Sequence, residues 1–142
     1  MPPAHTRAMS TIYVARSAGL SKWASEVGLS KNVFKIGCTE QPVKELVAAG
    51  WAGETDWQLV KAEDAAGLDE DVVLQRIARS EKVIEPRYYP RIRGTPGLFK
   101  VDPAHVERHI LVGRALAGET ERGVLKLKPG DFATYLIHNA RK

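Results

Sequence analysis

The sequence predicts an α+β fold in which a small antiparallel sheet is flanked by helices. Two short runs near the start, residues 11–14 and 33–37, are rich in β-branched and aromatic residues, which favours strands. Segments with helix start and stop signals separate these runs from later strands. With 142 residues, 44% of them hydrophobic, the chain suffices for one compact domain and is too short for two.

The first half of the chain alternates strands and helices. A strand over 11–16 leads into a sixteen-residue connection, 17–32, where Ser21 is the expected cap of a short helix over 21–27. The second strand ends at Gly37. A helix is expected over 42–49, where Gly50 stops it, and residues 56–62 alternate well enough for a third strand.

The second half continues in the same way. Residues 68–80 carry apolar side chains at helical spacing behind an acidic first turn, which the helix dipole favours. A short strand over 98–101 precedes a helix over 103–117, for which Asp102 is the cap. A strand is expected over 124–128. The last apolar run, 132–137, fits either a helix or a strand.

This order predicts a flexible leader over 1–10, a domain over 11–101, and an extension over 102–142 that packs on the same domain. No stretch approaches the roughly 18 apolar residues of a membrane helix, and the start lacks the apolar core of a secretory signal. We therefore expect a cytoplasmic protein that does not enter membranes, and the single cysteine agrees with a reducing compartment.

The formal charge of +4 is unevenly distributed. Residues 1–84 hold ten Lys/Arg and eleven Asp/Glu, whereas residues 85–142 hold eleven and six. Guanidinium groups suit phosphate oxygens and tyrosines can stack on bases, so the basic, tyrosine-rich part of this second region is the candidate nucleic-acid surface. Its expected contacts are Arg87, Tyr88, Tyr89, Arg91, Arg93 and Lys100. Alternatively, this segment only covers a sheet edge, with its charges in solvent.

The two early strands also resemble the signature of the GIY-YIG endonuclease superfamily. Phe34-Lys35-Ile36-Gly37 is similar to the Tyr-Lys-Ile-Gly form of a phage- and plasmid-associated branch, and the likeness spans residues 11–101. It implies a GIY-YIG-like domain that cleaves DNA by metal-dependent phosphodiester hydrolysis. Tyr13 matches the first-motif tyrosine, whose phenol orients or deprotonates the attacking water. Equally, a strand tyrosine can simply pack its ring against the sheet.

Two lysines take positions where the family has other residues. Lys35 stands at the second tyrosine of the name motif and could attend the phosphate, although an exposed strand lysine usually stays in water. The family arginine on the following helix falls at Glu45 or its neighbour Lys44. Lys44 could replace it as a point charge without bidentate geometry; otherwise cleavage is severely impaired.

The resemblance places the metal-binding acid in the first turn of the 68–80 helix. Glu70 is the expected Mg²⁺ ligand and Asp71 the substitute, because the apolar spacing after Glu70 reproduces that of the family. Acids at this position also stabilise a helix without any metal. His105 and His109 share one helix face, but no third zinc ligand accompanies them, so a solvated face is expected.

The leading hypothesis is therefore a DNA-acting, Mg²⁺-dependent GIY-YIG-like nuclease. The first alternative is a catalytically inactive module of the same fold that binds nucleic acid or a protein partner, and the altered second motif and missing arginine support it. The second alternative is that the likeness is accidental and the chain is a small α+β interaction protein.

Overall fold

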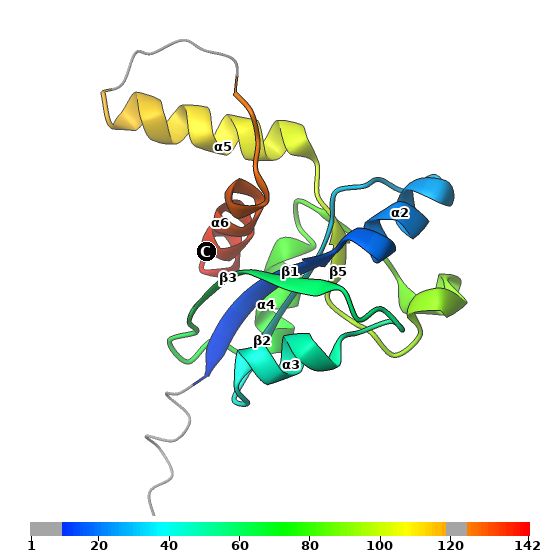
Figure 1. Cartoon of the computed structure of the whole chain (residues 1–142). Coiled ribbons are helices and arrows are strands. Elements are labelled where there is room, and N and C mark those ends of the chain that lie inside the picture. Colours follow the sequence, from blue (N-terminus) through cyan, green and yellow to red (C-terminus); the bar gives the residue numbers. More distant parts are fainter. Residues whose placement is uncertain (1–9, 119–124) are drawn as a thin grey trace, which may run out of the picture.

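The computed structural model describes residues 10–118 and 125–142, so most of the expected leader lies outside the described residues. It contains a five-stranded sheet with the order β3-β1-β2-β5-β4, in which all neighbours are antiparallel (Figure 1). The strands are β1 (Thr11–Ser17), β2 (Val33–Thr39), β3 (Trp57–Asp64), β4 (Lys82–Val83) and β5 (Leu98–Lys100). The predicted α+β fold class is confirmed.

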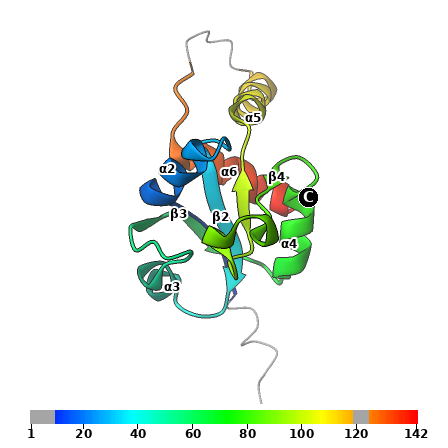
Figure 2. The same ribbon diagram turned by 90° about the vertical axis from the view of Figure 1, so that its right-hand side faces the viewer.

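Helices cover both faces of this sheet (Figure 2). Side chains alternate between the faces along each strand, so Ile12 and Val14 join one core with α4 (Glu70–Ile77) and α6 (Pro129–Ala140). On the other face, Ala15 packs with residues of α2 (Ala18–Glu26) and α3 (Val43–Ala49). Tyr13 lies directly opposite Gly37 in the β1–β2 register and belongs to the α2–α3 face.

The first helix begins earlier than the sequence predicts. Ser17, not Ser21, is the N-cap of α2, and its Oγ accepts a hydrogen bond of 3.0 Å from the Leu20 amide. Ser17 Oγ also donates to the carboxylate of Asp56, which holds the cap in place. Ser21 is buried inside the helix. The predicted cap at Ser21 was therefore wrong. Ser17 is held as the cap by Asp56, which lies 39 positions away in the chain and so forms no part of the local sequence pattern.

Helix α4 is shorter than the predicted span of 68–80. Asp69 is its extended N-cap, and the chain before it turns through Ala66 and Gly67, both with positive φ. These left-handed residues cannot continue a right-handed helix. Glu70 therefore becomes the first residue of α4.

Beyond the expected strand β5, helix α5 (Pro103–Leu116) is capped by Asp102 as predicted, with Asp102 Oδ1 accepting from the Ala104 amide at 2.9 Å. The predicted strand over 124–128 is wrong for residues 125–128, which form no strand, and Val124 lies outside the described residues. The ambiguous run 132–137 belongs to α6. A helix here presents six buried side chains to the sheet and α4, namely Phe132, Ala133, Tyr135, Leu136, Ile137 and Ala140.

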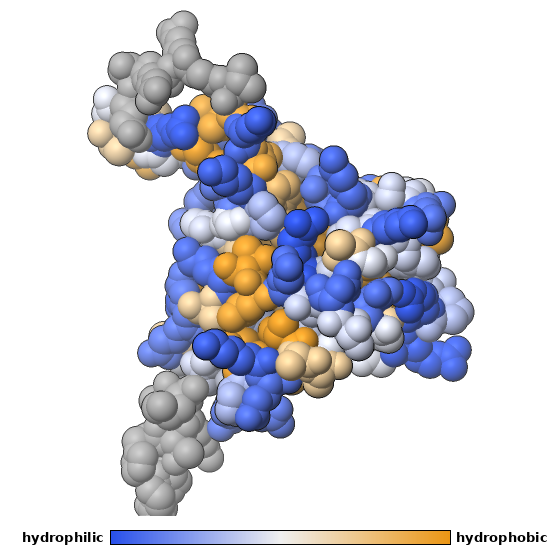
Figure 3. Space-filling view, viewed as in Figure 1, coloured by the Kyte–Doolittle hydropathy of each residue, from blue (hydrophilic) through white to orange (hydrophobic). Residues whose placement is uncertain are grey.

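Two features of the fold were not predicted from the sequence. The short strand β4 extends the sheet edge, and two 3₁₀ turns, Pro86–Tyr88 and Pro90–Ile92, form the basic segment after it. Helix α5 projects from the body of the molecule (Figure 1) and exposes Leu111, Val112 and Leu116. Figure 3 shows apolar surface along this helix. Within the described ranges, no helix has the length and apolar character needed to span a membrane.

Candidate active site

Tyr13, Gly37 and Glu70 meet where β1, β2 and the start of α4 come together. A methyl group placed at Gly37 would lie 2.7 Å from the Tyr13 hydroxyl oxygen and 2.5 Å from Glu70 Oε1. Both oxygens therefore approach the bare backbone of Gly37 more closely than any other residue would permit. The phenol and the carboxylate, which lie 57 positions apart in the chain, share one small space.

The free edge of β2 explains how Glu70 reaches this space. Strand β5 pairs with β2 only as far as Lys35, so the amide of Cys38 has no strand partner on that side. Glu70 Oε1 accepts a hydrogen bond of 2.9 Å from this amide. The carboxylate is thereby fixed beside Gly37, at the end of β2.

Lys35 completes the cluster from the same face of β2. Its Nζ donates to the Tyr13 hydroxyl at 3.2 Å and to the Ile36 carbonyl at 3.4 Å. The side chain is buried, with only 4% of the residue exposed. The expectation that a strand lysine stays in water is therefore wrong at this position. Gly97 makes room for it, because a methyl group there would lie 3.1 Å from the ammonium.

Trp51 covers this cluster and was not singled out from the sequence. Its ring stacks on Tyr13 with 5.7 Å between the ring centroids, and the Lys35 ammonium lies 5.2 Å from the Trp51 centroid. The tight turn that follows Trp51 places Ala52 at φ 56°. The only local signal was an aromatic residue after the helix-stopping Gly50, which is too common a pattern to indicate a site.

The cluster has unusual proton equilibria. Burial raises the pKa of the Tyr13 phenol well above its ordinary value, and the Glu70 charge acts in the same direction. Burial lowers the pKa of Lys35 to about 8, although Glu70 opposes that change. Burial also raises the pKa of the Cys38 thiol to about 11, so Cys38 is no thiolate nucleophile at neutral pH. Of these three groups, Lys35 is thus the one whose pKa lies nearest to neutral pH.

Glu70 is the predicted Mg²⁺ ligand and the exposed Asp71 its predicted substitute. Mg²⁺ commonly keeps several waters and takes only one or two carboxylates, so a half-buried glutamate at a helix start is a suitable donor. Among residues 10–118 and 125–142, no group of three or more His, Cys, Asp or Glu side chains is arranged to hold a metal. A metal here would therefore depend on water and substrate oxygens for its remaining ligands.

Lys44 stands apart from the other predicted catalytic residues. It is exposed on α3 and makes no hydrogen bond or ion pair with Tyr13, Lys35 or Glu70. Glu45, the neighbouring candidate for the family's arginine position, is exposed as well. The cation that the structure brings to the phenol is Lys35.

The arginines of the predicted nucleic-acid surface differ in how firmly they are held. Arg91 forms an ion pair with Glu54 and donates to the Ala52 carbonyl at 2.9 Å, so it braces the turn that carries Trp51. Arg87 pairs with Glu85 at 3.1 Å. Arg93 is exposed and forms no ion pair with another described residue.

The remaining predicted contacts gather at the β4 edge of the sheet. Tyr88 is 70% exposed, whereas Tyr89 is half-buried and packs edge-on against Trp23 with 5.7 Å between centroids. Tyr88, Tyr89 and Lys100 line one cavity of about 320 Å³ together with Lys82. The segment thus both covers the sheet edge and presents aromatic and cationic groups to solvent.

Comparisons with known proteins found no matching family model, no similar curated protein and no similar solved structure. The expected resemblance to GIY-YIG nucleases accordingly depends on the motif residues of the sequence alone.

Proposed function

We propose that this protein is a GIY-YIG-like nuclease that hydrolyses phosphodiester bonds in DNA with the help of Mg²⁺. The single observation that carries the proposal is the meeting of the Tyr13 hydroxyl and the Glu70 carboxylate over Gly37. A phenol beside a carboxylate is the combination that the resemblance implies, and here Lys35, at the position of the family's second tyrosine, adds a buried cation. These three groups come from separate elements, β1, α4 and β2.

The pKa shifts suggest how the residues would divide the work. Because the Tyr13 phenol holds its proton well above pH 10, it would orient the attacking water by hydrogen bonding. Lys35, with a pKa of about 8, would accept a proton from that water when neutral and would offer positive charge to the phosphate when protonated. Glu70 would hold Mg²⁺, which when bound supplies further positive charge to the phosphate oxygens.

DNA would be held by the basic segment between β4 and β5. Arg93 and Lys100 offer cations to backbone phosphates, and the exposed Tyr88 ring offers a stacking surface. Arg91, which is already engaged with Glu54 and Ala52, would act by positioning the Trp51 turn.

Plasmid nicking tests the catalytic part of the proposal. Supercoiled plasmid is incubated with Mg²⁺ or Mn²⁺ and with the protein, Tyr13→Phe, Glu70→Gln, Lys35→Met or Lys22→Ala, the last being an exposed control on α2. We expect nicking by the protein and by Lys22→Ala, and a loss of at least about a hundredfold in the other three. Equal nicking by all five proteins would indicate a contaminating nuclease and would contradict the proposed nuclease activity.

A DNA titration at about 50 and about 200 mM salt tests the binding part. Arg93→Ala and Lys100→Ala should weaken binding and reduce its salt dependence, whereas Lys22→Ala should leave both unchanged. If the first two variants bind like the parent protein, this segment is not the DNA surface.

One observation favours a second candidate, a catalytically inactive module that binds nucleic acid or a protein partner. Tyr13 and Lys35 are only 2% and 4% exposed, and the Trp51 ring stacks on the phenol. A phosphodiester would have to displace Trp51 to reach them. Salt-dependent DNA binding by a protein that nicks no plasmid under any metal condition would support this second candidate.

A further inference from the structure

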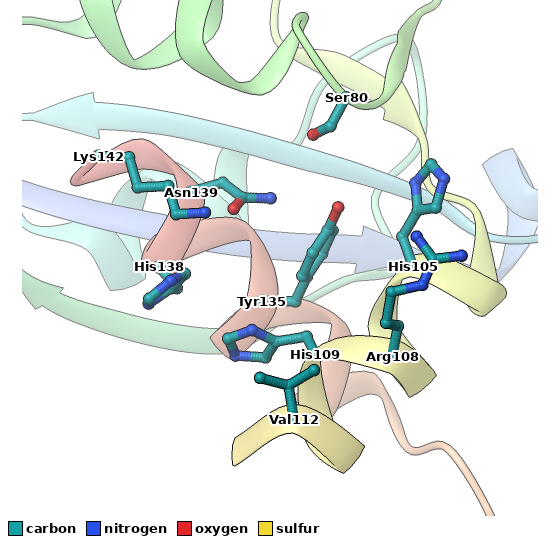
Figure 4. A pocket seen from close by; sticks show the side chains of 9 residues that line it. All are labelled: Ser80, His105, Arg108, His109, Val112, Tyr135, His138, Asn139 and Lys142. Atoms are coloured by element: carbon teal, nitrogen blue, oxygen red, sulfur yellow. The ribbon is translucent and has the colours of Figure 1, made fainter. Parts of the chain in front are cut away.

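A groove of about 410 Å³ lies between α5 and α6, away from the Tyr13 cluster (Figure 4). The Tyr135 ring separates Arg108 on one side from His138 and Lys142 on the other, so these charged groups do not converge on one ligand. Access to the Tyr13 cluster depends instead on the short segment that follows α3.

This segment, the Trp51 turn of residues 50–54, covers two buried groups of the cluster. The Trp51 ring lies nearly parallel to the Tyr13 ring, with 9° between the ring planes and 5.7 Å between the centroids. It also lies 5.2 Å from the Lys35 ammonium. Because Tyr13 and Lys35 are only 2% and 4% exposed, a substrate can touch neither side chain until Trp51 moves.

The backbone around Trp51 allows such a movement. Gly50, with φ 76°, precedes Trp51 at the end of α3, and a glycine accepts wide changes of φ and ψ. The Trp51 carbonyl accepts a hydrogen bond of 3.0 Å from the Glu54 amide, which makes residues 51–54 one compact unit. Exposed, irregular backbone at residues 55–56 joins this unit to β3. The unit therefore has a hinge on each side.

Arg91 holds this unit closed from the basic segment. Its guanidinium donates to the Ala52 carbonyl at 2.9 Å and forms an ion pair with Glu54. The side chains of this ion pair are partly exposed, Arg91 by 35% and Glu54 by 22%. Such an ion pair contributes little stability, and a phosphate offers the same guanidinium two acceptor oxygens. Arg91 is therefore a latch that a nucleic-acid backbone can release.

We propose that the Trp51 turn is a lid over Tyr13 and Lys35, and that DNA opens it by drawing Arg91 from Glu54 to a backbone phosphate. Trp51 then leaves the phenol, and the phosphate to be cleaved takes its place. This inference rests on the proposed function, because DNA is the ligand that releases the latch. It adds regulation to the site, since the buried lysine becomes accessible only when DNA is bound.

The affinity for DNA tests the latch. If DNA must break the ion pair, removing Glu54 leaves Arg91 free to bind phosphate, so Glu54→Ala should bind a short DNA duplex about two- to fivefold more tightly than the parent. Glu45→Ala removes an equal charge from an exposed position of α3 and should leave the affinity unchanged. Equal affinities of the parent and Glu54→Ala would contradict the latch.

Fluorine NMR of the full chain labelled with 5-fluorotryptophan reports the position of the lid. The three tryptophans give three signals, which single Trp-to-Phe variants assign. The difference in each signal between light and heavy water measures the exposure of that indole. Without divalent metal, we expect a saturating DNA duplex to shift the Trp51 signal, because the ring leaves Tyr13. In Glu54→Ala, Trp51 should be more exposed than in the parent before DNA is added, whereas Glu45→Ala should match the parent.

Arg91→Lys provides a second variant in case Glu54→Ala folds poorly. Its ammonium keeps the positive charge but lacks the fork of donors that joins the Ala52 carbonyl to Glu54, so Trp51 should again be more exposed in the free protein.

The outcomes separate the lid from the nuclease. If the duplex binds and plasmid is nicked while the Trp51 signal stays unchanged, the lid is overturned and the nuclease stands. If the Trp51 signal responds as expected but no plasmid is nicked, the lid is supported and the catalytic proposal fails. A protein that binds no duplex overturns both.

Discussion

At the scale of single residues, the candidate site depends on two glycines whose lack of a side chain leaves room for the functional groups. Gly37 has no side chain, so the Tyr13 phenol and the Glu70 carboxylate can approach the same stretch of backbone. Gly97, with φ +84°, makes equivalent room for the Lys35 ammonium. The buried lysine is stabilised by two hydrogen bonds and two aromatic rings rather than by a direct ion pair.

The two glycines should respond differently to alanine. At Gly37 the new methyl group meets the Glu70 carboxylate and the buried Tyr13 phenol in ordinary strand backbone, so both side chains must shift and we expect a loss of stability of about 1 to 2 kcal/mol. At Gly97 it meets the Ile36 carbonyl oxygen at 2.5 Å in a left-handed conformation, so we expect a loss of about 2 to 4 kcal/mol. Urea denaturation of both variants measures the difference, and a larger loss at Gly37 would contradict this account.

Lys35 should make stability depend on pH. Its folded pKa of about 8 lies below the ordinary 10.5, so between these values the unfolded chain binds more protons than the folded protein, and stability from this group rises with pH. Comparison with Lys35→Met isolates the effect from Tyr13 and Cys38. From pH 7 to pH 10.5, the free energy of unfolding of the parent should increase by up to about 3 kcal/mol relative to that of Lys35→Met. Parallel curves would show that Lys35 is not buried as a cation.

At the scale of elements, contacts between segments far apart in the chain set where each helix begins. Ser17 caps α2 while also donating to Asp56, which precedes β3. The Gly19 amide donates to the same carboxylate at 2.8 Å. These hydrogen bonds lower the pKa of Asp56, with the one from Ser17 first among them.

Ser17→Ala should therefore destabilise the protein by about 1 to 2 kcal/mol at pH 7, whereas Ser25→Ala, at an exposed position of the same helix, should have little effect. Because the folded pKa of Asp56 is lowered, its contribution is present above pH 3.8 and disappears as the pH falls further. The difference in unfolding free energy between the parent and Ser17→Ala should accordingly decrease below about pH 4, as measured by denaturation at several pH values. If the difference in unfolding free energy between the parent and Ser17→Ala stays constant down to pH 2, the contribution of the Ser17 cap does not depend on the Asp56 charge.

At the scale of the whole molecule, the last helix completes the core. Helix α6 covers the sheet face opposite Tyr13 and packs with α4, and Arg76 donates to the Ala140 carbonyl at 2.8 Å. Arg141 joins the end of the chain to β3 through Glu63 at 3.0 Å and the Asp64 carbonyl at 2.8 Å. The segment predicted as an extension is thus part of the same core as the sheet.

Two leucine substitutions test this integration. Leu136 is fully buried in α6, so Leu136→Ala should cost about 2 to 5 kcal/mol. Leu116 is 85% exposed on α5, so Leu116→Ala should change stability by less than about 0.5 kcal/mol. Thermal and urea unfolding give both values. Equal, small effects would mean that α6 contributes little to the fold.

Local sequence patterns were enough to predict the fold class, the first two strands and the Asp102 cap of α5. Each of these follows from local chemistry: β-branched runs favour strands, and an aspartate before a proline favours a helix start. Resemblance to a motif also singled out Tyr13, Lys35 and Glu70, which the fold brings together.

Which of the predicted site residues lie together depends instead on contacts between distant segments of the chain. Lys44 was expected at the phosphate but is exposed, while Lys35 was expected in water but is buried under Trp51. The Ser17 cap, the helical form of 132–137 and the α5–α6 groove likewise depend on partners many residues away. Burial and electrostatics are properties of three-dimensional surroundings, and a local pattern of residues carries no record of them.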